Sequence, residues 1–180
     1  LARLGSGSAC RSIPAGFVEW HAGTDSESSY AETIAPPEHW DLRDLIAIVQ
    51  TEHKDVGSTA GQTLIDTSPF NAARIEAAER GLPVVRRAIL ECDFETFGEE
   101  TELEALRMHA VALTTRPSVI YWQPETVRIM QAVRAWRDEG LPAYFTIDAG
   151  ANVHVLCQGA DADAVEERLR AIEGVRQILS

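Results

Sequence analysis

An α+β fold is predicted by three features of the chain: strand patterns at the front, a long helical block in the middle, and a strand, strand, helix, strand order in the last third. The 180 residues are 45% hydrophobic and contain no stretch that resembles a flexible linker. One domain with one substantial core is therefore expected. Its sheet should be mixed or antiparallel and should pack with the helical block.

The front of the chain predicts a short helix followed by strands. A helix is expected over residues 8–13, and alternating apolar residues over 17–20 predict a strand whose partner is 29–34. Residues 44–50 contain the continuous apolar run Leu-Ile-Ala-Ile-Val. A run of this kind predicts a strand at the centre of the sheet, buried on both faces.

The middle of the chain, residues 69–114, has helical periodicity. Gly-Leu-Pro at 81–83 and Cys-Asp at 92–93 interrupt the pattern, so about three helices are expected. Acidic residues without a neighbouring base form a run here, for which we expect a solvated helix face: Glu91, Asp93, Glu95, Glu99, Glu100, Glu102 and Glu104.

The last third predicts a helix and then a ferredoxin-like ββαβ unit. Pro124 suits the first position of a helix that ends near Asp138. The remaining elements are expected in this order: strands over 143–147 and 152–156, a helix capped by Asp161 that ends near Ile172, and a strand over 175–179.

Charge and composition exclude several classes of function. The net charge of −12 repels polyanions, and no basic stripe offsets it, so nucleic acid is not an expected partner. A small phosphorylated metabolite remains compatible, because local amides and one or two arginines can hold it. No apolar stretch approaches the roughly 20 residues needed to span a bilayer. Cys10, Cys92 and Cys157 lack metal-site or disulfide spacing and indicate reduced thiols in a cytoplasmic protein.

Three segments of small residues could bind an anion: 5–12, 57–61 and 148–152. Glycines allow close backbone approach, amides at a helix start point toward an anion, and Arg11 could grip a carboxylate in a two-point fork. Each segment also has a purely structural explanation, as a turn before a helix, a helix cap and a turn between strands. Together, two anion cradles, Arg11 and Asp148 suit phosphoryl chemistry on a substrate with phosphate and carboxylate groups.

The sequence pattern predicts structural roles for the histidines and tryptophans. None of the histidines has a partner at helical spacing, and all are expected to be surface or satisfied core residues: His21, His39, His53, His109 and His154. The tryptophans are expected to fill the core or its rim: Trp20, Trp40, Trp122 and Trp136. No Gly-x-Ser-x-Gly motif supports a serine hydrolase.

The small-residue segments also carry a family resemblance. Ala-Arg-Leu-Gly-Ser-Gly-Ser-Ala-Cys-Arg-Ser at 2–12 and Tyr-Phe-Thr-Ile-Asp-Ala-Gly-Ala-Asn at 144–152 resemble the mevalonate diphosphate decarboxylase family of the GHMP kinase superfamily. Further similar motifs follow in the same order at 16–20, 54–59, 67–69 and 108–110. The resemblance implies a GHMP kinase-like fold and ATP-dependent decarboxylation of a phosphorylated mevalonate in isoprenoid biosynthesis.

The resemblance also implies roles for individual residues. Asp148 matches the aspartate that orients or deprotonates the substrate hydroxyl, and Arg11 matches the arginine that holds the carboxylate. Substrate-binding positions are implied at Ser6, Gly7, Ser8, Arg11, Ser58 and Thr59. The family further implies ATP and Mg²⁺, with no metal ligand assigned in this chain, and a homodimer.

The family's ATP-binding loop precedes the motif with which this chain begins. Residues 1–180 are therefore expected to be the C-terminal, substrate-binding portion of a larger enzyme, inactive without its nucleotide-binding part. Gly57, Gln62 and Ala151 differ from the usual family residues and leave mevalonate monophosphate open beside the diphosphate. Two other possibilities remain: a mevalonate kinase-like phosphotransferase without decarboxylation, and a non-catalytic binding or dimerisation fragment.

Overall fold

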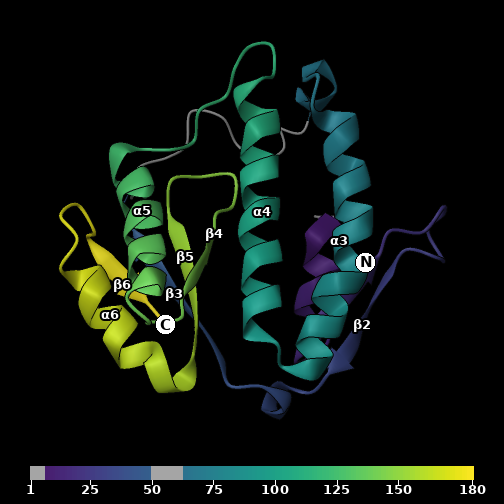
Figure 1. The fold of residues 1–180 in the computed structure, drawn as a ribbon. Helices are drawn as coiled ribbons and strands as arrows, with labels where there is room; N and C mark the ends of the chain where they lie inside the picture. The colour runs from purple at the N-terminus through teal and green to yellow at the C-terminus, as the bar shows by residue number, and fades with distance from the viewer. Residues whose placement is uncertain (1–6, 50–62) are drawn as a thin grey trace.

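The computed structural model describes residues 7–49 and 63–180, which form helices packed with two antiparallel sheets (Figure 1). No helix within the described ranges is long and apolar enough to cross a membrane. The strands are β1 (Phe17–His21), β2 (Tyr30–Ala35), β3 (Leu42–Ile48), β4 (Tyr144–Thr146), β5 (Val153–Gln158) and β6 (Gln177–Leu179). The α-helices are α3 (Asn71–Glu91), α4 (Phe94–Leu113), α5 (Pro124–Asp138) and α6 (Ala162–Arg170).

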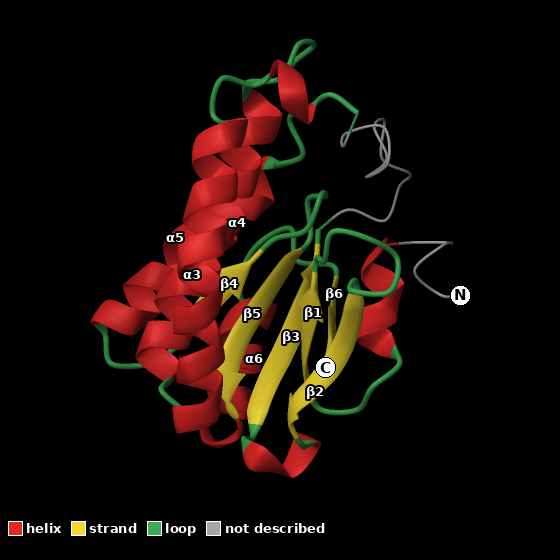
Figure 2. Cartoon of the chain, turned by 90° about the vertical axis from the view of Figure 1, so that its right-hand side faces the viewer, coloured by secondary structure: helices red, strands yellow, loops and turns green. Residues whose placement is uncertain are grey.

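The larger sheet has the strand order β4-β5-β3-β6, with every pair antiparallel (Figure 2). The connection β5-α6-β6 passes over β3, so β3 lies inside the sheet as predicted. The ββαβ order of the last third is also confirmed. The smaller sheet is the β1-β2 hairpin, whose pairing agrees with the prediction from residues 17–20 and 29–34.

The main core lies between the larger sheet and the helices α5 and α6, which cover one of its faces (Figure 1). Leu45 and Ala47 of β3 point into this core together with alternate residues of β5. The prediction that β3 is buried on both faces is wrong, because Asp44 is exposed and Ile46 is only partly buried. One face of β3 packs on helices, and the other carries mixed polar and apolar side chains.

The helical block contains two helices where about three were expected. Gly81 and Pro83 lie inside α3, and the helix continues past them because it packs along its length against α4. The second interruption is correctly located: Cys92 adopts φ 53°, and Asp93 donates its amide to the carbonyl of Ala88 at 2.9 Å. This Schellman-type turn ends α3.

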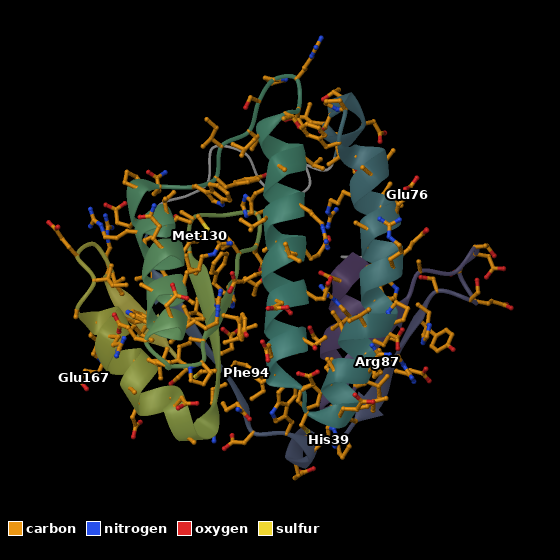
Figure 3. The ribbon with its side chains drawn as sticks, viewed as in Figure 1. His39, Glu76, Arg87, Phe94, Met130 and Glu167 are labelled. Carbon is orange, nitrogen blue, oxygen red and sulfur yellow. The ribbon has the colours of Figure 1, made fainter. Side chains whose placement is uncertain are left out.

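A second apolar cluster joins α4 to the edge strand β4. Trp40, Phe94 and Tyr144 are buried together, and a Cβ on Gly98 would lie only 2.0 Å from Cδ2 of Tyr144. The absence of a side chain at Gly98 thus lets the Tyr144 ring lie directly on α4. Figure 3 shows Phe94 at the start of α4, with His39 near the end of α3.

The acidic run on α4 is not uniformly solvated, which corrects the prediction. Glu102 is only 4% exposed and lies 2.6 Å from Nη1 of Arg137 on α5. Asp93 accepts the amide hydrogen of Thr96 at the helix start. The expected cap of α6 is also different: Asp161 occupies the cap position, but its side chain makes no capping hydrogen bond. The tryptophans do lie in the core or at its rim, with Trp40 and Trp136 buried.

Candidate active site

Asp148 lies at the end of β4, in the loop of residues 147–152 that leads into β5. Its side chain is exposed, whereas Ile147, Gly150 and Ala151 around it are buried. The carboxylate therefore stands on a buried base and is accessible to a ligand. This arrangement suits a group that accepts a proton from, or orients, a substrate hydroxyl.

Neighbouring elements hold this loop by hydrogen bonds. Thr126 of α5 is fully buried and donates its hydroxyl to the carbonyl of Ala151 at 2.6 Å. Asn152 accepts the amide hydrogen of Val49 through Oδ1 at 3.0 Å, which ties the loop to the end of β3. Inside the loop, the Gly150 amide lies 2.6 Å from the Asp148 carbonyl oxygen. The backbone that carries Asp148 is thus fixed from two sides.

His109 of α4 supports the same loop from a third side. Its side chain is 1% exposed, and its ring lies 5.0 Å from that of Trp122 and 5.9 Å from that of Tyr121 between centroids. Burial lowers the pKa of His109, while the backbone of Ile147 and Asp148 and the Asp148 carboxylate act in the opposite direction. His109 is therefore a neutral imidazole at physiological pH. Its Nε2 has no hydrogen-bond partner in the described part of the chain, whereas the ring does interact with the backbone of Ile147 and Asp148, so the expected core histidine is satisfied there in part.

The buried His109 should make stability depend on pH. In the unfolded chain an imidazole takes up a proton below about pH 6.5, whereas the folded state binds it only at lower pH. The contribution of His109 to stability should therefore fall as the pH is lowered from 7 to 5, by at most about 1.4 kcal/mol per pH unit. We expect urea unfolding of His109→Gln to show a weaker pH dependence in this range. An identical dependence in both proteins would contradict the assignment.

Arg11 and Ser8 lie in a short 3-10 helix, Gly7–Ser12, in agreement with the predicted helical turn. Both residues are exposed. Arg11 lines a cavity of about 220 Å³ together with residues of β1, β2 and α3. Within residues 7–49 and 63–180, no hydrogen bond or ion pair joins Arg11 to Asp148. The two predicted catalytic residues thus lie on separate elements.

Several predicted site residues fall outside the described ranges. These are Ser6, Ser58 and Thr59, together with the segment 57–61 that was expected to begin a helix. Gly7 begins the 3-10 helix. The structure accordingly describes the surroundings of Gly7, Ser8, Arg11 and Asp148.

Other reactive groups in the described ranges do not indicate a competing site. The three cysteines form no disulfide bond in the described part of the chain, and burial raises the pKa of Cys157 to about 11, which disfavours the thiolate needed for nucleophilic attack. Among the described residues, no three His, Cys, Asp or Glu side chains are grouped so that they could hold a metal ion.

Sequence reasoning found Asp148 but missed the residues that hold its loop. Thr126 and His109 lie on helices distant in sequence from the loop, and nothing in their spacing marks them as its partners. Asn152 was included in the 148–152 segment only as part of a turn, whereas it also fixes β3. Two signals were available: His109 lies within the 108–110 motif that carries the family resemblance, and a threonine two residues after Pro124 suits the first turn of a helix.

Family comparisons agree with these motifs. Residues 44–177 match a family model described as "Mevalonate 5-diphosphate decarboxylase C-terminal domain", and residues 1–31 match one described as "Diphosphomevalonate decarboxylase-like N-terminal domain". The first match covers most of β3, the four α-helices of the described ranges and the Asp148 loop. The resemblance found in the sequence is thereby confirmed.

Relatives with assigned functions carry the same description. The chain is 39% identical over 170 residues to diphosphomevalonate decarboxylase from Candida albicans, covering 92% of this chain and 47% of the relative. It is 42% identical over 164 residues to the enzyme from Bos taurus, covering 87% of this chain and 41% of the relative. The chain thus spans about half the length of the curated relatives it matches.

Solved structures confirm the α+β fold. Mevalonate diphosphate decarboxylase from Staphylococcus aureus has a TM-score of 0.92 and 35% identity, over 98% of this chain and 54% of the other. A chain described as "MDDEF in complex with MVAPP, AMPPCP and Magnesium" has a TM-score of 0.90 and 37% identity, over 98% and 55% of the two chains.

Proposed function

The chain belongs to the mevalonate 5-diphosphate decarboxylase family, and from this premise we propose that it is the substrate-binding part of an ATP-dependent decarboxylase acting on mevalonate diphosphate. The observation that carries the proposal is the exposed carboxylate of Asp148 on a loop held by β3, α4 and α5. The description of the Candida albicans and Bos taurus relatives supports the choice of the diphosphate as substrate.

The proposed reaction has two stages. The tertiary hydroxyl oxygen of the substrate attacks the γ-phosphorus of ATP, the hydroxyl proton leaves toward Asp148, and ADP departs. The bond from carbon to the new phosphate then breaks, and the bond to the carboxylate carbon supplies the electron pair of the product double bond as carbon dioxide leaves. A fixed carboxylate suits the first stage, because it holds the hydroxyl in line and accepts its proton.

The other predicted residues are assigned to substrate binding. Arg11 is proposed to pair with the substrate carboxylate, because a guanidinium forms two parallel hydrogen bonds to such a group. Its exposure and its position beside a cavity of about 220 Å³ leave room for that partner. Serine hydroxyls and backbone amides at Ser6, Gly7 and Ser8, with Ser58 and Thr59, are proposed to hold the phosphates.

Magnesium is proposed for the complete enzyme, since a relative of similar fold is described with AMPPCP and magnesium. The described residues do not fit a dedicated magnesium site, because they contain no suitable cluster of acidic or histidine ligands. No step is therefore assigned to the metal on this chain. The nucleotide-binding part of the larger enzyme is proposed to bind the ATP.

Product analysis of the full-length enzyme tests the function. The enzyme is incubated with ATP and Mg²⁺ and, separately, with mevalonate, its monophosphate and its diphosphate, and ADP, phosphate and carbon dioxide are measured. We expect equal amounts of all three products with the diphosphate. A stable phosphorylated acid without carbon dioxide would instead identify a kinase-like phosphotransferase. Turnover with the monophosphate alone would overturn the proposed substrate, and failure to turn over any of the three would indicate a binding fragment.

A further inference from the structure

Close to Asp148, the face of the larger sheet opposite α5 and α6 carries a histidine hydrogen-bonded to an aspartate. Nδ1 of His154 on β5 lies 2.8 Å from Oδ2 of Asp44 on β3. Their side chains are 23% and 45% exposed, respectively. The hydrogen bond fixes one ring nitrogen of His154 and therefore sets the orientation of the imidazole.

Strand register places this pair on the same face as Thr146. His154 pairs with Thr146 of β4 and with Ile46 of β3, and Asp44 is the diagonal neighbour two residues before Ile46. Val153 and Val155, which flank His154, point to the opposite face and into the core beneath α5 and α6. The pair thus lies on the sheet face opposite α5 and α6, which α4 covers only at β4, and His154 follows the loop that carries Asp148 by two residues.

The groups around His154 come from β3, from β4 and from the Asp148 loop. The hydrogen bond to Asp44 raises the pKa of His154, burial opposes the rise, and the negative charges of Asp44 and Asp148 add to it. The strand β4 contributes the uncharged Thr146 opposite His154. From α4, His109 also faces the Asp148 loop, but burial lowers its pKa and keeps it neutral. Of the two histidines beside this loop, His154 is the one whose pKa is raised, because its ring is hydrogen-bonded to the Asp44 carboxylate.

The following inference rests on the proposed function, in which the ligand is an anion. We propose that His154, held by Asp44, is a ligand-binding residue of the Asp148 site, and that its protonated form attracts the anionic, phosphorylated substrate. Asp44 and Asp148 are the two carboxylates whose charges act on His154, and the proposed ligand is itself negatively charged. Loss of the proton from His154 would remove the positive charge that offsets these carboxylates and would weaken binding.

The proposal predicts a change in KM rather than in kcat. A single charge that acts at several ångströms across a partly exposed site changes affinity by about three- to tenfold. The reacting hydroxyl and Asp148 are not altered, so kcat should change little. An effect on KM alone is the kinetic sign of lost substrate binding.

The experiment measures KM and kcat of the full-length enzyme for mevalonate diphosphate between pH 6 and 9. At pH 6, His154→Gln should raise KM by about three- to tenfold relative to the unmodified enzyme, because glutamine carries no charge. His154→Lys should retain the low KM and keep it low at pH 8 to 9, since a lysine remains protonated there. Comparison of variants at one pH removes the contribution of the substrate's own ionisation.

Two further variants separate the charge from the fold. Asp44→Asn removes the acceptor that favours the imidazolium, so the pH at which KM rises should move downward. His21→Gln is the matched control, because His21 forms a comparable exposed pair with Glu32 at 3.0 Å in the other sheet. Its KM should equal that of the unmodified enzyme.

Equal KM values for His154→Gln and the unmodified enzyme at pH 6 would overturn the proposal. It would also fail if His154→Lys lost affinity as severely as His154→Gln, since the role would then be structural. Failure of the unmodified enzyme to decarboxylate the substrate is a different result, which rejects the proposed function itself.

Discussion

Replacing Asp148 with asparagine in the full-length enzyme lowers kcat for decarboxylation by about 10²- to 10⁴-fold, the usual contribution of a positioned acid–base group. Asparagine has nearly the same shape and retains hydrogen-bonding capacity, but it cannot accept the hydroxyl proton. The exposed side chain makes no hydrogen bond that the fold depends on in the described structure, so folding should be preserved. Rates of ADP and carbon dioxide release under saturating substrate measure the effect.

The matched control for this experiment is Asp138→Asn. Asp138 is also exposed and lies at the end of α5, away from the loop of residues 147–152. The Asp138→Asn substitution removes the same charge from the protein without altering the proposed site, so the kcat of this variant should match that of the unmodified enzyme. If Asp148→Asn retained full activity, the assignment of the catalytic proton acceptor would be wrong.

The loop around Asp148 also shows which parts of an active site a sequence can reveal. The residues that face the ligand form compact motifs, so Arg11 and Asp148 could be proposed from local pattern and family resemblance. The side chains that hold the loop, His109 and Thr126, come from α4 and α5. Their roles depend on how helices pack on the sheet, which local spacing does not specify.

The helical block gives a second example of the same limit. Gly81 and Pro83 are individually unfavourable inside a helix, and propensity alone predicts a break there. Packing against α4 outweighs that local cost, and α3 runs from Asn71 to Glu91 without interruption. The boundary at Cys92 and Asp93 was predictable because aspartate favours the start of a helix. In the structure, Cys92 adopts the left-handed conformation that ends α3, and the Asp93 side chain caps α4.

Glu102 is the residue for which the sequence pattern was most misleading. It belongs to an acidic run, yet it lies between α4 and α5 and pairs with Arg137 at 2.6 Å and with Arg134 at 3.4 Å. Arg137 in turn donates to the carbonyl of Ala143 and stacks over the Tyr144 ring, 4.2 Å from its centroid. One carboxylate thus links α5 to the start of β4, the strand that leads to Asp148.

Glu102→Ala is therefore expected to lower the free energy of unfolding by about 3 kcal/mol or more, because it leaves a largely buried guanidinium without its counter-charge. Urea unfolding of the protein measures the change. Glu166→Ala is the control: Glu166 pairs with Arg170 on the surface of α6, and its loss should cost less than about 1 kcal/mol. The double variant Glu102→Leu with Arg137→Met should be less destabilised than Glu102→Ala, because it removes the unpaired charge together with its partner. Equal losses for Glu102→Ala and Glu166→Ala would show that the link between α4, α5 and β4 does not depend on this ion pair.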